Sequence, residues 1–263
     1  MLLKLESLPP ARNSRGCCLI LLLTLLAGPA SSLAQTGAES PYYARKNTFG
    51  VFTAYSNDSS HMLLGITENR KLLDFGVSYS RRLLLNRIVN WQYNAEFLPV
   101  ALESDPLEQE VVNQISPTPV TQIFKDGLPV TCAPRTISYS STDPVTGVTY
   151  SGTAVFSCYG RRWTIGEGIS PAGLQWNFRP RHKVQPFFIS HGGYMYSTQA
   201  IPVYGAGSFN FTFDLGAGVE VFRTQTRSVR AEYRYHHISN NSTATANPGI
   251  DSGLFQLTYS FGH

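Results

Sequence analysis

The sequence predicts an all-β protein, an eight-stranded antiparallel transmembrane β-barrel with one long extracellular insertion. Three observations favour this fold class. Apolar and polar residues alternate with a period of two in many segments, which is typical of strands that separate two environments. Charged residues are few, at 14%, while aromatic residues are abundant, at 12%, and 42% of the residues are hydrophobic. A membrane-spanning barrel spreads its apolar residues over alternate positions, whereas a soluble globular protein usually carries more lysine and glutamate.

Residues 1–34 are expected to be a secretory signal peptide. A region with Lys and Arg precedes the apolar run Cys17–Ala27, and Ser32-Leu33-Ala34 offers a small-x-small cleavage site. The apolar run is shorter than the roughly 20 residues that a transmembrane helix needs. We therefore expect an exported chain in which residues 35–263 form the barrel.

The alternation is strongest between Phe209 and Val221. Odd positions there are apolar or aromatic, and even positions are polar, glycine or charged. The apolar face is too bulky for the interior of a small barrel, so we expect it to contact lipid. Five further segments alternate in this way, and two others do so less regularly: residues 73–79, 89–97, 174–178, 229–235 and 255–261, then 47–56 and 184–194. These segments predict about eight strands, and an even number closes an antiparallel barrel.

Connections of different length indicate the two ends of the barrel. Residues 84–88, 179–183 and 223–228 are short, as periplasmic turns are, while those on the other side are longer. The longest is an insertion of about residues 101–160, expected to be a small β-excursion over the barrel mouth. It holds Cys132 and Cys158, which in an exported chain predict one disulfide. Such a loop closure would stabilise the fold by roughly 3 kcal/mol.

Charged residues at the inward positions are expected to pair with one another or to be hydrated inside the barrel. His191 and His236 are expected to be hydrogen-bonded there as well. The charged set comprises Asp74, Glu96, Glu220, Arg230, Glu232 and Arg234.

A histidine, a hydroxyl and a carboxylate lie at the two ends of one loop near the C-terminus. If the strand alternation continues, His237, Ser239 and Asp251 all fall on the outer face of two adjacent strands. Polar groups on a lipid-facing surface are costly, which indicates a function. Ser239 as nucleophile, His237 as general base and Asp251 as the orienting acid would form a hydrolase triad. The alternative is an ordinary surface turn, since Ser, Asn and Thr are common in this loop.

The same loop offers donors for an oxyanion. Asn247 and the amides of the Asn240–Asn241 turn are the expected donors, and Pro248-Gly249 would fix the loop that presents Asn247. No glycine-rich phosphate loop, zinc-helix motif or nucleic-acid patch is present in the sequence. The spacing of the two cysteines matches no metal motif. We expect no metal, no organic cofactor and no nucleic-acid partner.

These residues resemble a known signature. The stretch Tyr235-His236-His237-Ile238-Ser239-Asn240, then Asn247-Pro248-Gly249 and an acid, is similar to the active-site signature of the PagL-type lipid A 3-O-deacylases. The resemblance implies an eight-stranded outer-membrane barrel whose triad faces the membrane, with His237 as base, Ser239 as nucleophile and Asn247 in the oxyanion hole. It places Asp251 where the family has a glutamate, which is one methylene longer. The insertion with Cys132 and Cys158 has no counterpart in the minimal family barrel.

The resemblance and the candidate triad together predict an esterase of the bacterial outer membrane. It would remove an ester-linked acyl chain, expected to be the 3-position hydroxyacyl chain, from lipid A. Its partners would be lipopolysaccharide in the outer leaflet and the membrane, and the sequence leaves a homodimer open. Two alternatives remain, namely a non-enzymatic structural or adhesive barrel whose insertion contacts partners, and a phospholipase or acyltransferase on the same scaffold.

Overall fold

The computed structural model describes residues 41–263, and the expected signal peptide lies outside the described residues. No helix in this part of the chain is long and apolar enough to cross a membrane. The described residues form ten strands and the short 3-10 helix η1 (Tyr204–Ala206). The strands are β1 (Asn47–Ser56), β2 (Lys71–Leu85), β3 (Val89–Ser116), β4 (Val120–Gly127), β5 (Arg135–Thr142), β6 (Thr149–Phe178), β7 (Val184–Ser197), β8 (Phe209–Thr224), β9 (Arg227–Ser239) and β10 (Ile250–Gly262).

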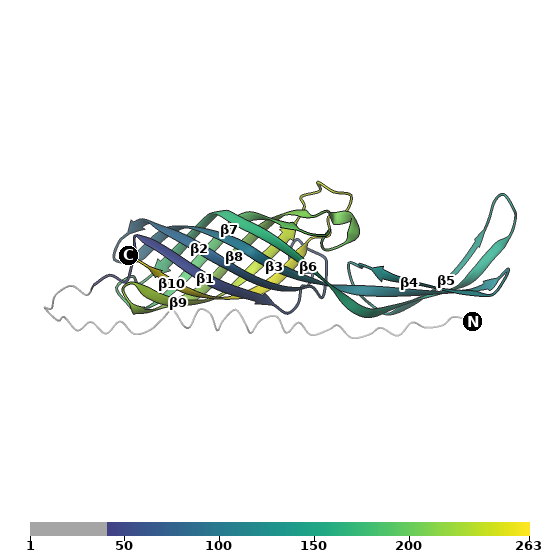
Figure 1. Cartoon of the computed structure of the whole chain (residues 1–263), viewed down its shortest axis with the longest axis horizontal. Coiled ribbons are helices and arrows are strands. Elements are labelled where there is room, and N and C mark those ends of the chain that lie inside the picture. The colour runs from purple at the N-terminus through teal and green to yellow at the C-terminus, as the bar shows by residue number, and fades with distance from the viewer. Residues whose placement is uncertain (1–40) are drawn as a thin grey trace, which may run out of the picture. The chain divides into compact units, whose positions relative to one another are not determined.

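Eight of these strands close into a barrel, as predicted (Figure 1). The hydrogen-bonded order is β3-β2-β1-β10-β9-β8-β7-β6, and a pairing between β3 and β6 completes the ring. Every pair of neighbours is antiparallel. Because a closed ring has no strand edge, all backbone groups within the wall can be paired, which a lipid environment requires.

The barrel wall is apolar outside and mostly polar inside, apart from a buried apolar cluster that includes Leu72, Ile238 and Leu254. In β8, Phe211, Phe213 and Leu215 are 42%, 45% and 57% exposed. Asn210 and Asp214, which alternate with them, are only 1% and 4% exposed. The apolar side chains therefore lie on the outer surface, where a membrane-spanning barrel contacts lipid.

Four of the six charged residues expected in the interior form ion pairs there: Glu96, Glu220, Glu232 and Arg234. Arg234 donates to both carboxylate oxygens of Glu96, at 2.8 and 2.7 Å, and to Glu232 at 3.1 Å. Asp74 is buried in the same interior. Further pairs in the interior are Arg45 with Glu220, Arg230 with Gln175, His191 with Asn94, and His236 with Asp214. These contacts replace the hydration that the charges lose inside the barrel.

The insertion continues two strands of the wall. The two strands β3 and β6 have 28 and 30 residues, whereas the other barrel strands have 10 to 16. Their far halves pair with β4 and β5 in a sheet of order β4-β3-β6-β5 (Figure 1). The predicted disulfide between Cys132 and Cys158 is present and links the β4–β5 connection to β6. The insertion is thus mostly strand, with its loops at the two ends of β4 and β5.

The connections separate into two kinds, as the sequence indicates. The turns β2–β3, β6–β7 and β8–β9 leave only residues 86–88, 179–183 and 225–226 between strands. The opposite end carries the longer segments 57–70, 198–208 and 240–249. In a membrane barrel the long connections are extracellular, so this end faces the outside. The candidate triad lies at this end.

Candidate active site

The register of three adjacent strands places His237 beside Asp251, with Ser239 two residues further along β9. His237 of β9 lies directly opposite Asp251 of β10, and on its other side it lies opposite Phe213 of β8. Ser239 follows two residues after His237 and pairs with Phe211. Residues two apart on a strand share a face, so His237 and Ser239 point to the same outer side of the wall.

A hydrogen bond joins the histidine to the acid. The distance from Nδ1 of His237 to Oδ1 of Asp251 is 2.6 Å. The side chain of His237 is 12% exposed and that of Asp251 is fully buried. Because a carboxylate can only accept, Nδ1 carries the proton and Nε2 is left as the basic nitrogen. The imidazole is therefore in the tautomer that a general base for Ser239 needs.

Asp251 accepts hydrogen bonds from three further groups. The hydroxyl of Tyr235 donates to Oδ1 at 2.8 Å. The backbone amides of Leu63 and Leu64 donate to Oδ2 at 2.7 and 2.8 Å. These amides belong to the loop of residues 57–70, which covers Asp251 although its position on β10 faces outward. A buried carboxylate needs such donors, because an unpaired charge away from water is very unfavourable.

Two glycines allow the loops to approach this closely. A Cβ atom on Gly65 would lie 2.6 Å from the backbone nitrogen of Asp251. Gly249 has a φ of 62°, and a Cβ atom there would lie 3.2 Å from Cε1 of His237. The left-handed conformation favours glycine at position 249, and the close contact favours it at position 65. Side chains at either position would push a loop away from the histidine–acid pair.

The two asparagines proposed as oxyanion donors have different surroundings. Asn240 is 1% exposed, and its side-chain amide donates to the carbonyls of Ala206 and Ala246, the second at 2.7 Å. Its backbone amide donates to Oδ1 of Asn247 at 3.1 Å. Asn247 is exposed, and its side-chain oxygen accepts this bond. The backbone amide of Asn240 is therefore bonded to Asn247, and the side chain of Asn240 holds the loop. The role of Asn247 as an oxyanion donor stays a prediction.

Sequence reasoning missed the groups that position the acid. Tyr235 could have been found, because it precedes His237 by two residues and shares its face. The rings of Tyr235 and His237 are stacked, with centroids 6.5 Å apart and an interplanar angle of 8°. The amides of Leu63 and Leu64 leave no signal, since every residue except proline has a backbone amide.

The surroundings of the site are apolar. Met62, Leu63 and Leu64 are 46%, 73% and 66% exposed, and Phe211 and Phe213 lie exposed on the strand beside β9. Ser239 itself is half-buried. Within residues 41–263 no group of three His, Cys, Asp or Glu side chains is arranged to hold a metal ion. A bonded histidine–acid pair and a serine therefore lie along the same outer face, at an apolar surface.

Comparison with protein families gives one match. The family model for lipid A 3-O-deacylase (PagL) matches residues 136–260, a range that includes His237, Ser239, Asn247 and Asp251. No curated protein matches the sequence significantly.

Several solved structures are similar to this chain. The outer membrane enzyme PagL has a TM-score of 0.43 and 13% identity, covering 81% of this chain and 99% of its own. Neisserial surface protein A has a TM-score of 0.40 and 11% identity, covering 83% and 97%. The outer membrane protein OprG from Pseudomonas aeruginosa has a TM-score of 0.37 and 9% identity, covering 85% and 100%.

Proposed function

We propose that this protein is a lipid A esterase, because a family model for lipid A 3-O-deacylase (PagL) matches residues 136–260 and the chain forms an eight-stranded barrel. It would remove an ester-linked acyl chain, the hydroxyacyl chain at the 3-position. The observation that carries the proposal is the 2.6 Å contact between His237 and Asp251, on the same outer face as Ser239. The family match supports hydrolysis of lipid A, and the contact supports the use of a serine triad for it.

The proposed reaction has two halves. Oγ of Ser239 attacks the ester carbonyl carbon while Nε2 of His237 takes the hydroxyl proton. The side-chain amide of Asn247 donates to the oxyanion, and Asp251 stabilises the imidazolium. Collapse breaks the bond to the sugar oxygen, which takes the proton from His237 as it leaves. Water then attacks the acyl-serine with the same histidine as base, and the free fatty acid departs.

The position of the site suits a lipid substrate. His237 and Ser239 lie on the outer face of the wall, at the end that carries the long connections. Acyl esters of a lipid lie just below its headgroups, which is the depth of the strand ends. The exposed side chains of Met62, Leu63 and Leu64 are suited to contact an acyl chain beside the acid.

The aspartate in place of the family glutamate fits the local geometry. Asp251 lies directly opposite His237 in the register, so its shorter side chain reaches Nδ1 at hydrogen-bonding distance. Its second oxygen is held by the amides of Leu63 and Leu64. The acid therefore has the contacts that orient an imidazole.

Fatty-acid release from separate lipids tests the proposal. Purified protein would be incubated with lipid A and, in parallel, with a diacyl phospholipid, and the released acids identified by gas chromatography and mass spectrometry. We expect a 3-hydroxy fatty acid from lipid A and none after Ser239→Ala. Release from the phospholipid alone would favour the phospholipase alternative. Release from neither lipid would favour a structural or adhesive barrel.

A further inference from the structure

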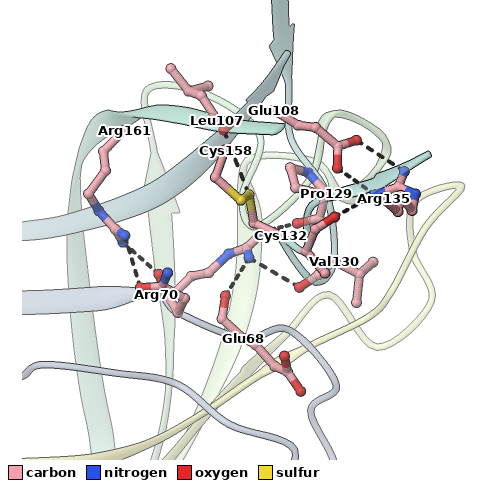
Figure 2. The surroundings of a disulfide bond; sticks show 12 residues. Glu68, Arg70, Leu107, Glu108, Pro129, Val130, Cys132, Arg135, Cys158 and Arg161 are labelled. Carbon is pink, nitrogen blue, oxygen red and sulfur yellow. Dashed lines mark hydrogen bonds and ion pairs between the residues drawn. A yellow bond between two sulfur atoms is a disulfide. The ribbon is translucent and has the colours of Figure 1, made fainter. Parts of the chain in front are cut away.

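The base of the insertion is bonded to the loop that covers Asp251. The disulfide between Cys132 and Cys158 holds the β4–β5 connection against β6 (Figure 2). Two carbonyl groups of that connection, those of Pro129 and Val130, accept hydrogen bonds from Arg70 at the end of loop 57–70. The insertion and the candidate site are therefore in physical contact through this loop.

Arg70 is the centre of this contact. Its side chain is fully buried, and its Nε forms an ion pair with Asp105 of β3 at 3.2 Å. Nη1 donates to the carbonyls of Glu68 and Val130, at 2.6 and 3.2 Å. Nη2 donates to those of Pro129 and Pro202, at 2.6 and 3.0 Å. The five donors of the guanidinium thus join β3, loop 57–70, the β4–β5 connection and the β7–β8 connection.

A short path leads from Arg70 to the acid. The amide of Glu68 also donates to the carbonyl of Val130, at 3.0 Å. The preceding residues bond to the segment before β10, because the backbone amides of Thr67 and Ile66 donate to the carbonyls of Gly249 and Pro248. Leu64 and Leu63 then donate to Asp251. Loop 57–70 is therefore held by the insertion at its C-terminal end, and its middle residues Leu63 and Leu64 contact the acid.

We propose that Arg70 is a positioning residue, which fixes loop 57–70 to the disulfide-held base of the insertion and thereby keeps the amides of Leu63 and Leu64 on Asp251. This rests on the proposed function of Asp251 in the triad. The insertion then has a role in the reaction besides any contact with partners, because its base completes the support of the acid. Arg70 itself touches neither substrate nor the reacting atoms.

Arginine suits this role better than lysine. Four backbone carbonyls and one carboxylate surround the side chain, and only the planar fork of a guanidinium reaches all of them. An ammonium has three donors on a longer flexible stem and leaves carbonyls without a partner. Arg70→Lys is therefore expected to keep the charge beside Asp105 but to loosen the loop.

The test compares kinetics in two backgrounds. We expect Arg70→Met to lower kcat by about 10- to 100-fold, the effect of a misplaced catalytic group, with little change in KM. The same factor is expected for lipid A and for a soluble short-chain nitrophenyl ester, and Arg70→Lys should fall between Arg70→Met and wild type. In an Asp251→Asn background, Arg70→Met should cost nothing further, because Arg70 acts only through the acid. If Arg70 had a purely structural role, the two fold-losses in kcat would multiply in the double variant.

Arg135 provides a matched control. It lies beside the same disulfide and pairs with Glu108 at 2.6 Å, but its side chain is 42% exposed and it does not contact loop 57–70 (Figure 2). Arg135→Met should keep the wild-type kcat. Folding of every variant would be checked by the heat-induced mobility shift of the barrel in electrophoresis.

The outcomes separate this inference from the proposed function. An inactive wild type, or a Ser239→Ala variant as active as wild type, would overturn the esterase proposal itself. If wild type is active and Ser239→Ala is not, the positioning role fails on any of three results. The first is a folded Arg70→Met variant with wild-type kcat and KM. The second is an Arg70→Met variant in which only KM rises. The third is a double variant in which the kcat losses of Arg70→Met and Asp251→Asn multiply.

Discussion

Asp251 accepts four hydrogen bonds, from His237, Tyr235, Leu63 and Leu64. Two of these donors are side chains and two are backbone amides, so substitutions other than those to proline remove the side-chain contacts only. Such a carboxylate is preorganised, since its charge is held opposite the imidazole before substrate arrives. The hydrogen bond from the Tyr235 hydroxyl can be removed by deleting one oxygen atom, as Tyr235→Phe does.

Tyr235→Phe is expected to lower kcat by up to roughly tenfold, since a hydrogen bond to a charged group contributes about 1.5 kcal/mol. The ring would still stack on His237, so KM should change little. Steady-state kinetics on lipid A would measure the effect. Tyr233→Phe is the matched control, because Tyr233 lies on the same face of β9 and is 60% exposed. Equal activities of the two variants would exclude a role for the Tyr235 hydroxyl.

Asn247→Ala is expected to lower kcat by about 10²- to 10³-fold, as the loss of one oxyanion donor does. KM should stay close to wild type, because the interaction forms with the transition state and not with the bound ester. A kcat within twofold of wild type would assign the oxyanion to other donors. Asn240→Ala should act differently and loosen the loop, since Asn240 is buried and bonded to Ala206 and Ala246.

Sequence reasoning reached part of this residue-level arrangement. Strand parity and the family signature both pointed to His237, Ser239 and Asp251, because alternation is a property of side-chain order. The cover over Asp251 could not be predicted in this way. It depends on backbone amides of a loop that is distant in sequence, and on the close approach that Gly65 allows.

Among the elements, the barrel strands were the most predictable. The expected segments 47–56 and 209–221 correspond to β1 and to most of β8, since one face of each meets lipid and the other a polar interior. The alternation is lost where β3 and β6 leave the wall. At that point the consecutive residues Glu103, Ser104 and Asp105 are all buried. In the insertion, every residue of β4 is exposed, so both of its faces are open. The length of these strands therefore depends on pairing with each other, which periodicity does not report.

The disulfide gives a prediction for the insertion as an element. Reduction of the folded protein, or the double change Cys132→Ser with Cys158→Ser, should lower kcat in the same direction as Arg70→Met and by a smaller factor. The reason is that the carbonyls of Pro129 and Val130 keep their partners but lose their anchor to β6. Kinetics before and after reduction would measure this, with thiol counting to verify cleavage. A fully reduced protein with unchanged kcat would disconnect the disulfide from the site.

For the whole molecule, the relevant property is that the site opens on the apolar side of the wall. Apolar side chains cover the outer surface of the barrel, and most inward residues are polar, apart from a buried apolar cluster that includes Leu72, Ile238 and Leu254. The proposed lipid substrate would therefore approach from the membrane and not through the barrel. The run Met62-Leu63-Leu64 extends this apolar surface onto the loop beside the acid.

Leu63→Asn combined with Leu64→Asn is expected to raise KM or lower turnover for lipid A while leaving hydrolysis of a soluble short-chain ester unchanged. Both backbone amides remain, so the support of Asp251 is kept and only the apolar contact is lost. Parallel assays on the two substrates would measure the difference. Val145→Asn, at a residue that is 90% exposed in the β5–β6 connection, is the control for added polarity. Equal losses on both substrates would contradict a contact with the acyl chain.

The most direct test of the central claim is a mass spectrum of lipid A before and after incubation with the folded protein. Wild-type protein is expected to lower the mass of lipid A by the mass of a single 3-hydroxyacyl chain. Ser239→Ala and His237→Ala are expected to leave the lipid A spectrum unchanged, because they remove the nucleophile and the base. An unchanged spectrum with wild type, or the same mass loss with both folded variants, would contradict a Ser239–His237 esterase acting on lipid A.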